Sequence, residues 1–184
     1  HMFCPRQNLK RVLSQVSEKG YVFNVGIEPE HYLVNKTSDG SISVWDPHNI
    51  DSLRNPCYDF KGTSNAINYL RKMMDAMGRL GWEPYQSDHE DGNGQYEINF
   101  AYSDALKTAD RYTFFKMMTS QYAQEIGAIA THMAQPFTNR VGNGGHIHYH
   151  LADAITSENL FIDEEDPRGL GLSELAYQFI AGIF

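Results

Sequence analysis

Three histidines follow a glycine-rich loop and alternate with apolar residues. The segment reads Gly142-Asn143-Gly144-Gly145-His146-Ile147-His148-Tyr149-His150. Because successive side chains of a strand point to opposite faces, His146, His148 and His150 should share one face. Histidine is the commonest nitrogen ligand for metals, and glycines allow a ligand to approach the backbone. A strand with a polar solvent face is the ordinary alternative, but three histidines behind a glycine loop favour a binding site.

Four glutamates form two pairs that could supply oxygen ligands. Glu28 and Glu30 lie two residues apart in a predicted strand, so their side chains share a face with Cα atoms about 7 Å apart. Glu90 and Glu97 bracket a glycine-containing turn that could bring both carboxylates to one point. Solvent exposure is the ordinary alternative for each pair. With His146, these carboxylates suit one or two Mg²⁺ or Mn²⁺ ions better than a structural zinc, which prefers Cys and His.

Some other side chains are weaker candidates for chemistry. Tyr102, Phe114 and Phe115 could stack on a base, although aromatic residues on a helix face usually belong to the core. Arg140 precedes the glycine loop and could meet an anion, although an ordinary surface arginine is the more common explanation. Cys57 has no evident histidine partner in the sequence, so we predict no thiol nucleophile.

The composition describes a globular chain with excess negative charge. The 184 residues are enough for one domain with a real core, and 41% of them are hydrophobic. The 15 Lys and Arg residues against 23 Asp and Glu residues give a net charge of −8, which excludes a basic nucleic-acid surface. Cys4 and Cys57 provide no disulfide framework, which indicates a reducing cytosol and a cytoplasmic protein. No apolar run reaches transmembrane length and no signal peptide is visible, so we expect no membrane partner.

Hydrophobic periodicity predicts the elements that position these side chains. Helices are expected over residues 5–19, from Thr63 or Ser64 to about 80, from about 104 to 126, and over 174–184 after a Ser173 cap. The second of these should bury Ile67, Leu70, Met74 and Met77. Strands are expected over 21–34, in two segments within 85–100, over 128–133 and at the three histidines. The stretch 35–61 is polar and turn-rich, and we expect it to decorate the fold.

Together these motifs resemble the catalytic domain of glutamine synthetase. Residues 26–30, Gly-Ile-Glu-Pro-Glu, resemble the family's G-x-E-x-E strand, and residues 90–97 resemble its E-x-x-P-G-Q-x-E hairpin. Residues 130–136 resemble A-T-F-M-P-K-P, and residues 142–148 resemble G-S-G-x-H-x-H. The motifs occur in the family's order from Leu9 onward. Residues 112–118 are similar to the bacterial type III-like branch, which includes γ-glutamylmethylamide synthetases.

The resemblance implies an α+β fold, with a curved and mainly antiparallel sheet backed by helices. It also implies ATP-dependent amide formation, in which glutamate is phosphorylated to γ-glutamyl phosphate and ammonia or a small amine then displaces the phosphate. Two divalent ions, Mg²⁺ or Mn²⁺, would relieve the repulsion between carboxylate and triphosphate and align the transfer. The expected partners are glutamate, ATP, the amine and further copies of the parent chain in a homo-oligomeric ring.

The resemblance also implies roles for the candidate residues. Glu30, Glu90 and Glu97 would hold the metal nearer the glutamate. Glu28 and His146 would hold the metal nearer the phosphates. His148 and His150 would touch the nucleotide phosphate, Tyr102 would lie near the nucleotide, and the Gly142 backbone would line the glutamate site. No catalytic residue is assigned within this chain.

Departures from the family pattern leave a second reading open. The family usually has serine at the position of His150, lysine at Gln135, and phenylalanine at His31 and His132. Residues 1–184 are expected to be a partial catalytic domain, with 1–2 as a cloning remnant and with the N-terminal β-grasp domain and the C-terminal part absent. We therefore expect no turnover from the isolated chain. The alternative is a non-catalytic, degenerate homologue that binds divalent metal or partner subunits.

Overall fold

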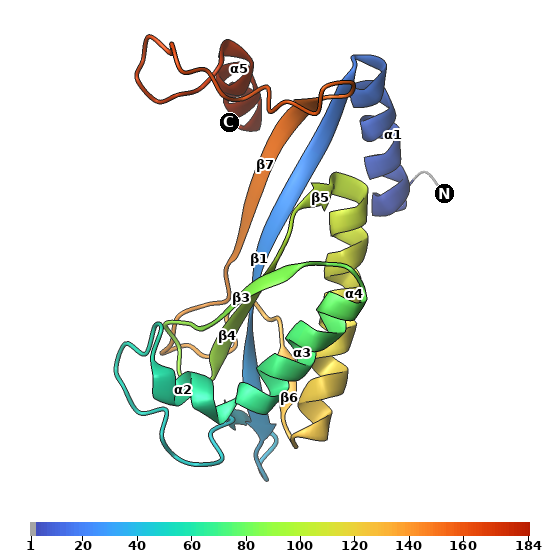
Figure 1. The fold of residues 1–184 in the computed structure, drawn as a ribbon. Coiled ribbons are helices and arrows are strands. Elements are labelled where there is room, and N and C mark those ends of the chain that lie inside the picture. Colours follow the sequence, from blue (N-terminus) through green and yellow to red (C-terminus); the bar gives the residue numbers. More distant parts are fainter. Residues whose placement is uncertain (1–2) are drawn as a thin grey trace. The chain divides into compact units, whose positions relative to one another are not determined.

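Strand β1 (Tyr21–Lys36) is the common partner of most other strands in the computed structural model, which describes residues 3–184 (Figure 1). It pairs with β2 (Ile42–Val44), β4 (Gln95–Phe100), β5 (Ser103–Asp104), β6 (Ile129–Thr131) and β7 (Gly145–Asp153). Strand β3 (Pro84–His89) pairs with β4. The pairings of β1 with β2, β4, β5 and β6 and of β3 with β4 are antiparallel, so the α+β prediction with a mainly antiparallel sheet is confirmed.

The helices begin and end largely where local signals place them. Their bounds are Pro5–Glu18 for α1, Phe60–Asn65 for α2, Ile67–Arg79 for α3, Ala105–Glu125 for α4 and Glu174–Ile183 for α5. The predicted cap of the last helix is confirmed, because the Ser173 side chain accepts a hydrogen bond from the Ala176 N–H. No helix among residues 3–184 is long and apolar enough to cross a membrane.

The second predicted helix starts earlier than expected and is interrupted. Asp59, rather than Thr63 or Ser64, caps α2 by accepting a hydrogen bond from the Gly62 N–H. Ala66, with φ −102° and ψ 9°, separates α2 from α3. Tyr69, Leu70, Met73 and Met77 are its buried residues, whereas the prediction for Ile67 is wrong because this side chain is 44% exposed.

The chain divides into two compact units. The larger unit contains residues 27–101 and 110–147, and its core joins strand residues to the inner faces of α3 and α4. That core includes Leu33, Tyr69, Leu70, Met73, Met77, Tyr96, Ile98, Phe100, Phe115 and Met118. The other unit contains the described residues up to 26 together with 102–109 and 148–184. In it, the rings of Phe23, Tyr149 and Phe161 surround Phe179 at centroid distances of 5.2–5.8 Å.

Candidate metal centre

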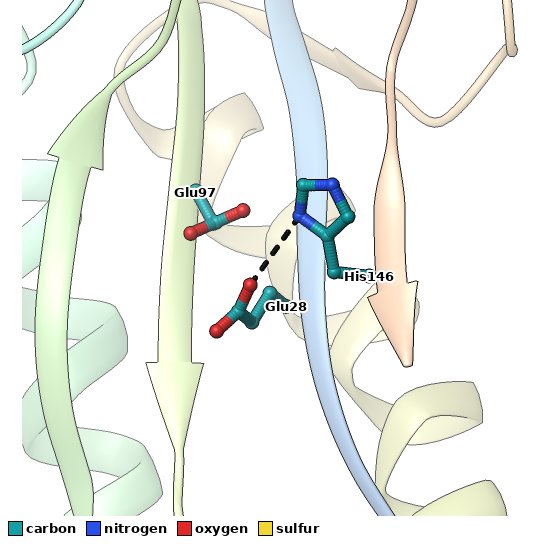
Figure 2. Close-up of side chains that lie close together, drawn as sticks. All are labelled: Glu28, Glu97 and His146. Carbon is teal, nitrogen blue, oxygen red and sulfur yellow. Dashed lines mark ion pairs between the residues drawn. The ribbon is translucent and has the colours of Figure 1, made fainter. Parts of the chain in front are cut away.

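Strand register brings three predicted ligands together in the larger unit. One ligand atom each of Glu28 on β1, Glu97 on β4 and His146 on β7 lies within 4.8 Å of the other two. Figure 2 shows the three side chains reaching toward one another from three strands. Nδ1 of His146 lies 3.4 Å from Oε2 of Glu28. Two carboxylates and an imidazole at this spacing form a donor set suited to a divalent cation.

Glu30 lies beside this group and is tied to the glycine loop. Its Oε2 accepts hydrogen bonds from the Gly144 N–H at 2.8 Å and from Nε2 of Gln95 at 2.7 Å. A Cβ on Gly144 would lie 2.7 Å from Oε1 of Glu30, so a larger residue at this position would displace that carboxylate. The glycine loop therefore contacts a predicted ligand through its backbone.

The carboxylates carry more negative charge than their surroundings neutralise. Burial raises the pKa of Glu90 to about 7, and the negative charges of Glu97 and Glu30 add to this rise. Burial also raises the pKa of Glu97, against the effect of a hydrogen bond from Asn99. A bound cation would relieve both effects, so the electrostatics of the four glutamates and the donor set fit a divalent metal.

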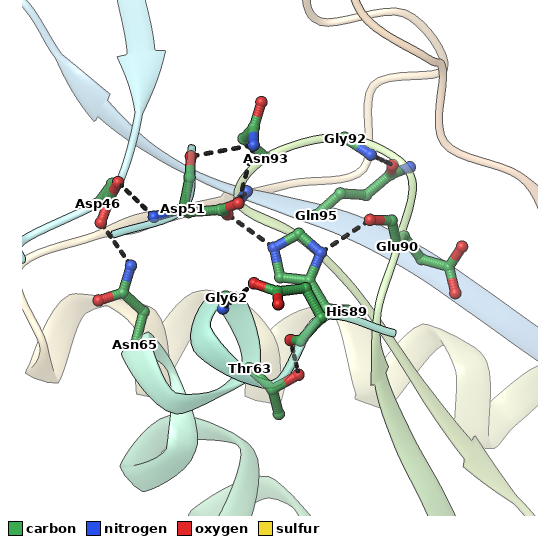
Figure 3. A network of polar contacts seen from close by, with 12 residues as sticks. Asp46, Asp51, Gly62, Thr63, Asn65, His89, Glu90, Gly92, Asn93 and Gln95 are labelled. Carbon is green, nitrogen blue, oxygen red and sulfur yellow. Dashed lines mark hydrogen bonds and ion pairs between the residues drawn. The ribbon is translucent and has the colours of Figure 1, made fainter. Parts of the chain in front are cut away.

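A buried polar network supports the hairpin that carries Glu90 (Figure 3). His89 and Asp51 form an ion pair with Nε2 and Oδ2 2.6 Å apart, and both side chains are almost wholly buried. Burial lowers the pKa of His89, but the hydrogen bond and charge of Asp51 outweigh this and leave the pKa above its ordinary value. Burial acts to raise the pKa of Asp51, but hydrogen bonds from His89 and Asn93 leave it below its ordinary value. Sequence reasoning missed this network, because Asp51 lies in the stretch expected only to decorate the fold.

Gln95 and Asn143 hold the glycine loop against the sheet. Nε2 of Gln95 donates to the Gly142 carbonyl at 3.0 Å and to Oδ1 of Asn143 at 3.1 Å. Nδ2 of Asn143 donates to the Met133 carbonyl at 2.8 Å. The Gly142 backbone thus lies close to the Glu30 carboxylate, since Gln95 contacts both.

Arg140 is more than an ordinary surface arginine. Its Nη1 donates to Oδ1 of Asn93 at 2.5 Å, and its guanidinium lies 5.6 Å from the centroid of the Phe137 ring. It lines a cavity of about 490 Å³ together with Arg54, Asn55, Asp91, Gly92, Asn93, Asn139 and Val141. A mainly polar cavity with two arginines beside the Glu90 hairpin suits an anionic or zwitterionic ligand.

The residues expected to meet the nucleotide gather in the other unit. The rings of Tyr102 and His150 meet edge-on with centroids 5.3 Å apart, and Nε2 of His150 lies 3.1 Å from Nδ2 of Asn24. A Cβ on Gly26 would lie 3.4 Å from Cβ of Tyr102 and 3.7 Å from Cβ of His148. The three predicted side chains are therefore neighbours, and Tyr102 is 62% exposed and open to a stacking ligand.

A family model described as glutamine synthetase, catalytic domain, matches residues 2–184. The chain belongs to the glutamine synthetase catalytic-domain family. A glutamate–methylamine ligase from Methyloversatilis universalis is 44% identical over 183 residues, and a glutamine synthetase from Rhizobium leguminosarum bv. phaseoli is 39% identical over 180 residues.

Solved structures agree with this membership of the glutamine synthetase family. A structure described as a GmaS/ADP complex matches 98% of the chain at a TM-score of 0.89 and 40% identity. A more distant one, described as a novel glutamine synthase homolog, has a TM-score of 0.81 at 23% identity and supports the fold alone. Almost the whole chain aligns with each of the two curated relatives above. It spans only 40% of the length of either relative.

Proposed function

We propose that this chain is the metal-binding part of an ATP-dependent ligase that joins ammonia or a small amine to the γ-carboxylate of glutamate. The observation that carries the proposal is the convergence of Glu28, Glu97 and His146 in a member of the glutamine synthetase family. The names of its relatives, a glutamate–methylamine ligase and a glutamine synthetase, supply the reaction class. The parent protein would act in the cytoplasm as a homo-oligomeric ring.

Five side chains would hold the divalent ions, Mg²⁺ or Mn²⁺. Glu30, Glu90 and Glu97 would bind the ion nearer the glutamate, and Glu28 and His146 the ion nearer the phosphates. The closeness of Glu97 to Glu28 and His146 supports a role for Glu97 at both ions. When bound, the ions would offset the repulsion between the substrate carboxylate and the triphosphate and stabilise charge on the transferring phosphoryl group.

The remaining predicted residues would bind the organic substrates. His148 and His150 would contact nucleotide phosphate, and the exposed ring of Tyr102 would lie against the nucleotide. The Gly142 backbone would line the glutamate site. This role is supported by the Gln95 side chain, which donates hydrogen bonds to both the Gly142 carbonyl and the Glu30 carboxylate. The departure at His150 supports the second candidate, a homologue that binds divalent metal or partner subunits without turnover.

A chimaeric enzyme tests the reaction. Residues 3–184 would replace the matching segment of the Methyloversatilis ligase, and phosphate release would be measured with glutamate, ATP, Mn²⁺ and either ammonia or methylamine. We expect glutamate- and amine-dependent turnover that Glu97→Gln abolishes. A folded chimaera that binds Mn²⁺ through Glu97 without turnover would favour the second candidate. A folded chimaera that neither binds Mn²⁺ nor turns over would overturn the ligase proposal and the metal-binding form of the second candidate.

A further inference from the structure

We propose that His89 is a positioning residue that fixes the Glu90 peptide for metal binding, with Asp51 as its buried anchor. The proposal rests on the metal role of Glu90 given above. It concerns a side chain that has no direct place in the donor set and that lies wholly inside the protein. Its neighbours are drawn in Figure 3.

The His89 ring bridges two segments through both of its nitrogens. Nδ1 lies 2.7 Å from the carbonyl oxygen of Glu90, and Nε2 lies 2.6 Å from Oδ2 of Asp51. Because a carbonyl oxygen can only accept, Nδ1 must donate to Glu90. The ring therefore connects the backbone of a predicted metal ligand to a buried carboxylate through two short hydrogen bonds.

Asp51 holds the far side of the same turn. Its Oδ2 accepts a hydrogen bond from the Gly94 N–H at 2.6 Å, and its Oδ1 accepts one from Nδ2 of Asn93 at 2.8 Å. The Glu90 N–H closes the turn by donating to the Gln95 carbonyl at 2.9 Å. Asp51 thus fixes one end of the turn directly and the Glu90 end through His89.

The His89 ring is closely packed between helix α2 and neighbouring side chains. A Cβ on Gly62 would lie 2.3 Å from Cδ2 and 2.5 Å from Nε2 of His89, so α2 can cover the ring only with glycine there. The Tyr96 ring meets the imidazole edge-on at 5.2 Å, and the Tyr58 N–H donates to the His89 carbonyl at 2.9 Å. A ring held on these sides cannot shift without moving the Glu90 peptide.

Two amide substitutions of His89 distinguish a role in positioning Glu90 from a role in stability alone. In His89→Gln the amide nitrogen can take the place of Nε2, which keeps the Asp51 contact and loses the Glu90 contact. In His89→Asn the amide nitrogen can take the place of Nδ1, which keeps the Glu90 contact and removes the hydrogen bond to Asp51. We expect His89→Asn to be the less stable variant, because the buried Asp51 carboxylate loses a hydrogen bond that His89→Gln retains.

The test measures Mn²⁺ affinity and metal-free melting temperature for the 184-residue chain and both variants. We expect His89→Gln to bind Mn²⁺ about 10–100-fold more weakly, as for other residues that orient metal ligands, and His89→Asn to bind more tightly than His89→Gln despite melting lower. His48→Gln, at an exposed histidine, is the matched control and should change neither value.

The outcomes distinguish this proposal from the proposed function. An original chain that binds no Mn²⁺ would overturn the proposed function and this inference with it. The inference alone would be overturned if the original chain binds Mn²⁺ and the variants bind it with unchanged affinity. The same holds if the affinity of the variants falls only in proportion to their melting temperature. If both variants fail to fold, Gly62→Ala decides, because it displaces the ring while leaving its hydrogen-bonding groups intact. In that variant, the proposal requires weaker Mn²⁺ binding.

Discussion

Glu30 on β1 and Glu97 on β4 occupy directly opposite positions in their antiparallel pair. Like charges at opposite positions of a sheet destabilise it. Glu28 shares the face of Glu30 and adds its own negative charge to the surroundings of Glu97. The sheet therefore holds a concentration of negative charge that a cation would offset, and the first prediction follows from it.

Mn²⁺ should stabilise the folded chain, and Glu97 should be needed for this. A ligand that binds only the folded state contributes about 2.7 kcal/mol to the unfolding free energy at 100 times its dissociation constant. Glu97→Gln should raise metal-free stability by about 0.2–1 kcal/mol by removing a like charge, and should lose most of the Mn²⁺ effect. Thermal melts with EDTA and with Mn²⁺ measure both changes. Glu18→Gln, at an exposed helix position, should behave as the original chain does.

Adjacent glycines in the loop should respond differently to alanine. A Cβ on Gly144 would lie 2.7 Å from Oε1 of Glu30, whereas a Cβ on Gly145 would meet nothing within 4 Å. Gly144→Ala should therefore displace the Glu30 carboxylate and weaken Mn²⁺ binding by about tenfold or more. Losses of this size are typical when a group that orients a metal ligand is removed. Titration calorimetry measures this, with Gly145→Ala as the control. Equal losses in the two variants would contradict the role given to Glu30.

Glu90 should make both stability and metal binding depend on pH. Burial raises its pKa in the folded chain to about 7, whereas the ordinary value is 4.5. Between these values the folded state binds more protons than the unfolded state, so the Glu90 contribution to metal-free stability falls as pH rises from 4.5 to 7. Mn²⁺ must displace this proton, so its apparent affinity should rise up to about tenfold per pH unit below 7.

Denaturant melts from pH 5 to 8 in EDTA measure the Glu90 effect. Glu90→Gln should gain stability relative to the original chain as pH rises, because the variant has no carboxylate to ionise. A stability difference that stays constant over this range would show that the Glu90 carboxyl titrates normally.

One buried and one half-buried histidine should make the fold sensitive to acid. Burial lowers the pKa of His132 to about 4, and burial also holds the pKa of His31 well below its ordinary value. Their rings lie 5.5 Å apart, with Nε2 of His31 2.8 Å from the Tyr69 hydroxyl. Below pH 6.5 these histidines become protonated more readily in the unfolded state than in the folded state. The folded state therefore loses stability as pH falls from 6.5 toward 4. The folding equilibrium constant should fall by up to about tenfold per histidine and pH unit.

Phenylalanine at either position removes the titrating group while keeping an aromatic ring. His31→Phe and His132→Phe should each flatten the fall in stability between pH 6.5 and 4, measured by chemical denaturation. If the pH dependence of stability is the same in the original chain and in both variants, the acid sensitivity does not come from His31 and His132.

Local patterns in the sequence already determined much of this protein. The glutamate and histidine motifs identified the family, and alternation and capping signals placed β1, the β3–β4 hairpin, α4, β7 and α5, because strand pleat, helix period and turn chemistry act over a few neighbouring residues. The predicted ligands Glu28, Glu97 and His146 do converge. By contrast, the cap of the second helix was misplaced, since three nearby side chains, Asp59, Thr63 and Ser64, could each have capped it.

Only the tertiary structure decided which distant groups meet. The Asp51–His89 contact joins residues 38 positions apart, and the Gln95–Glu30 hydrogen bond joins residues 65 positions apart. No periodic signal marks such a pair, because its members are brought together by chain packing rather than by their own propensities. The pKa of Glu90 likewise depends on burial and on neighbouring charges, and these exist only once the strands have paired.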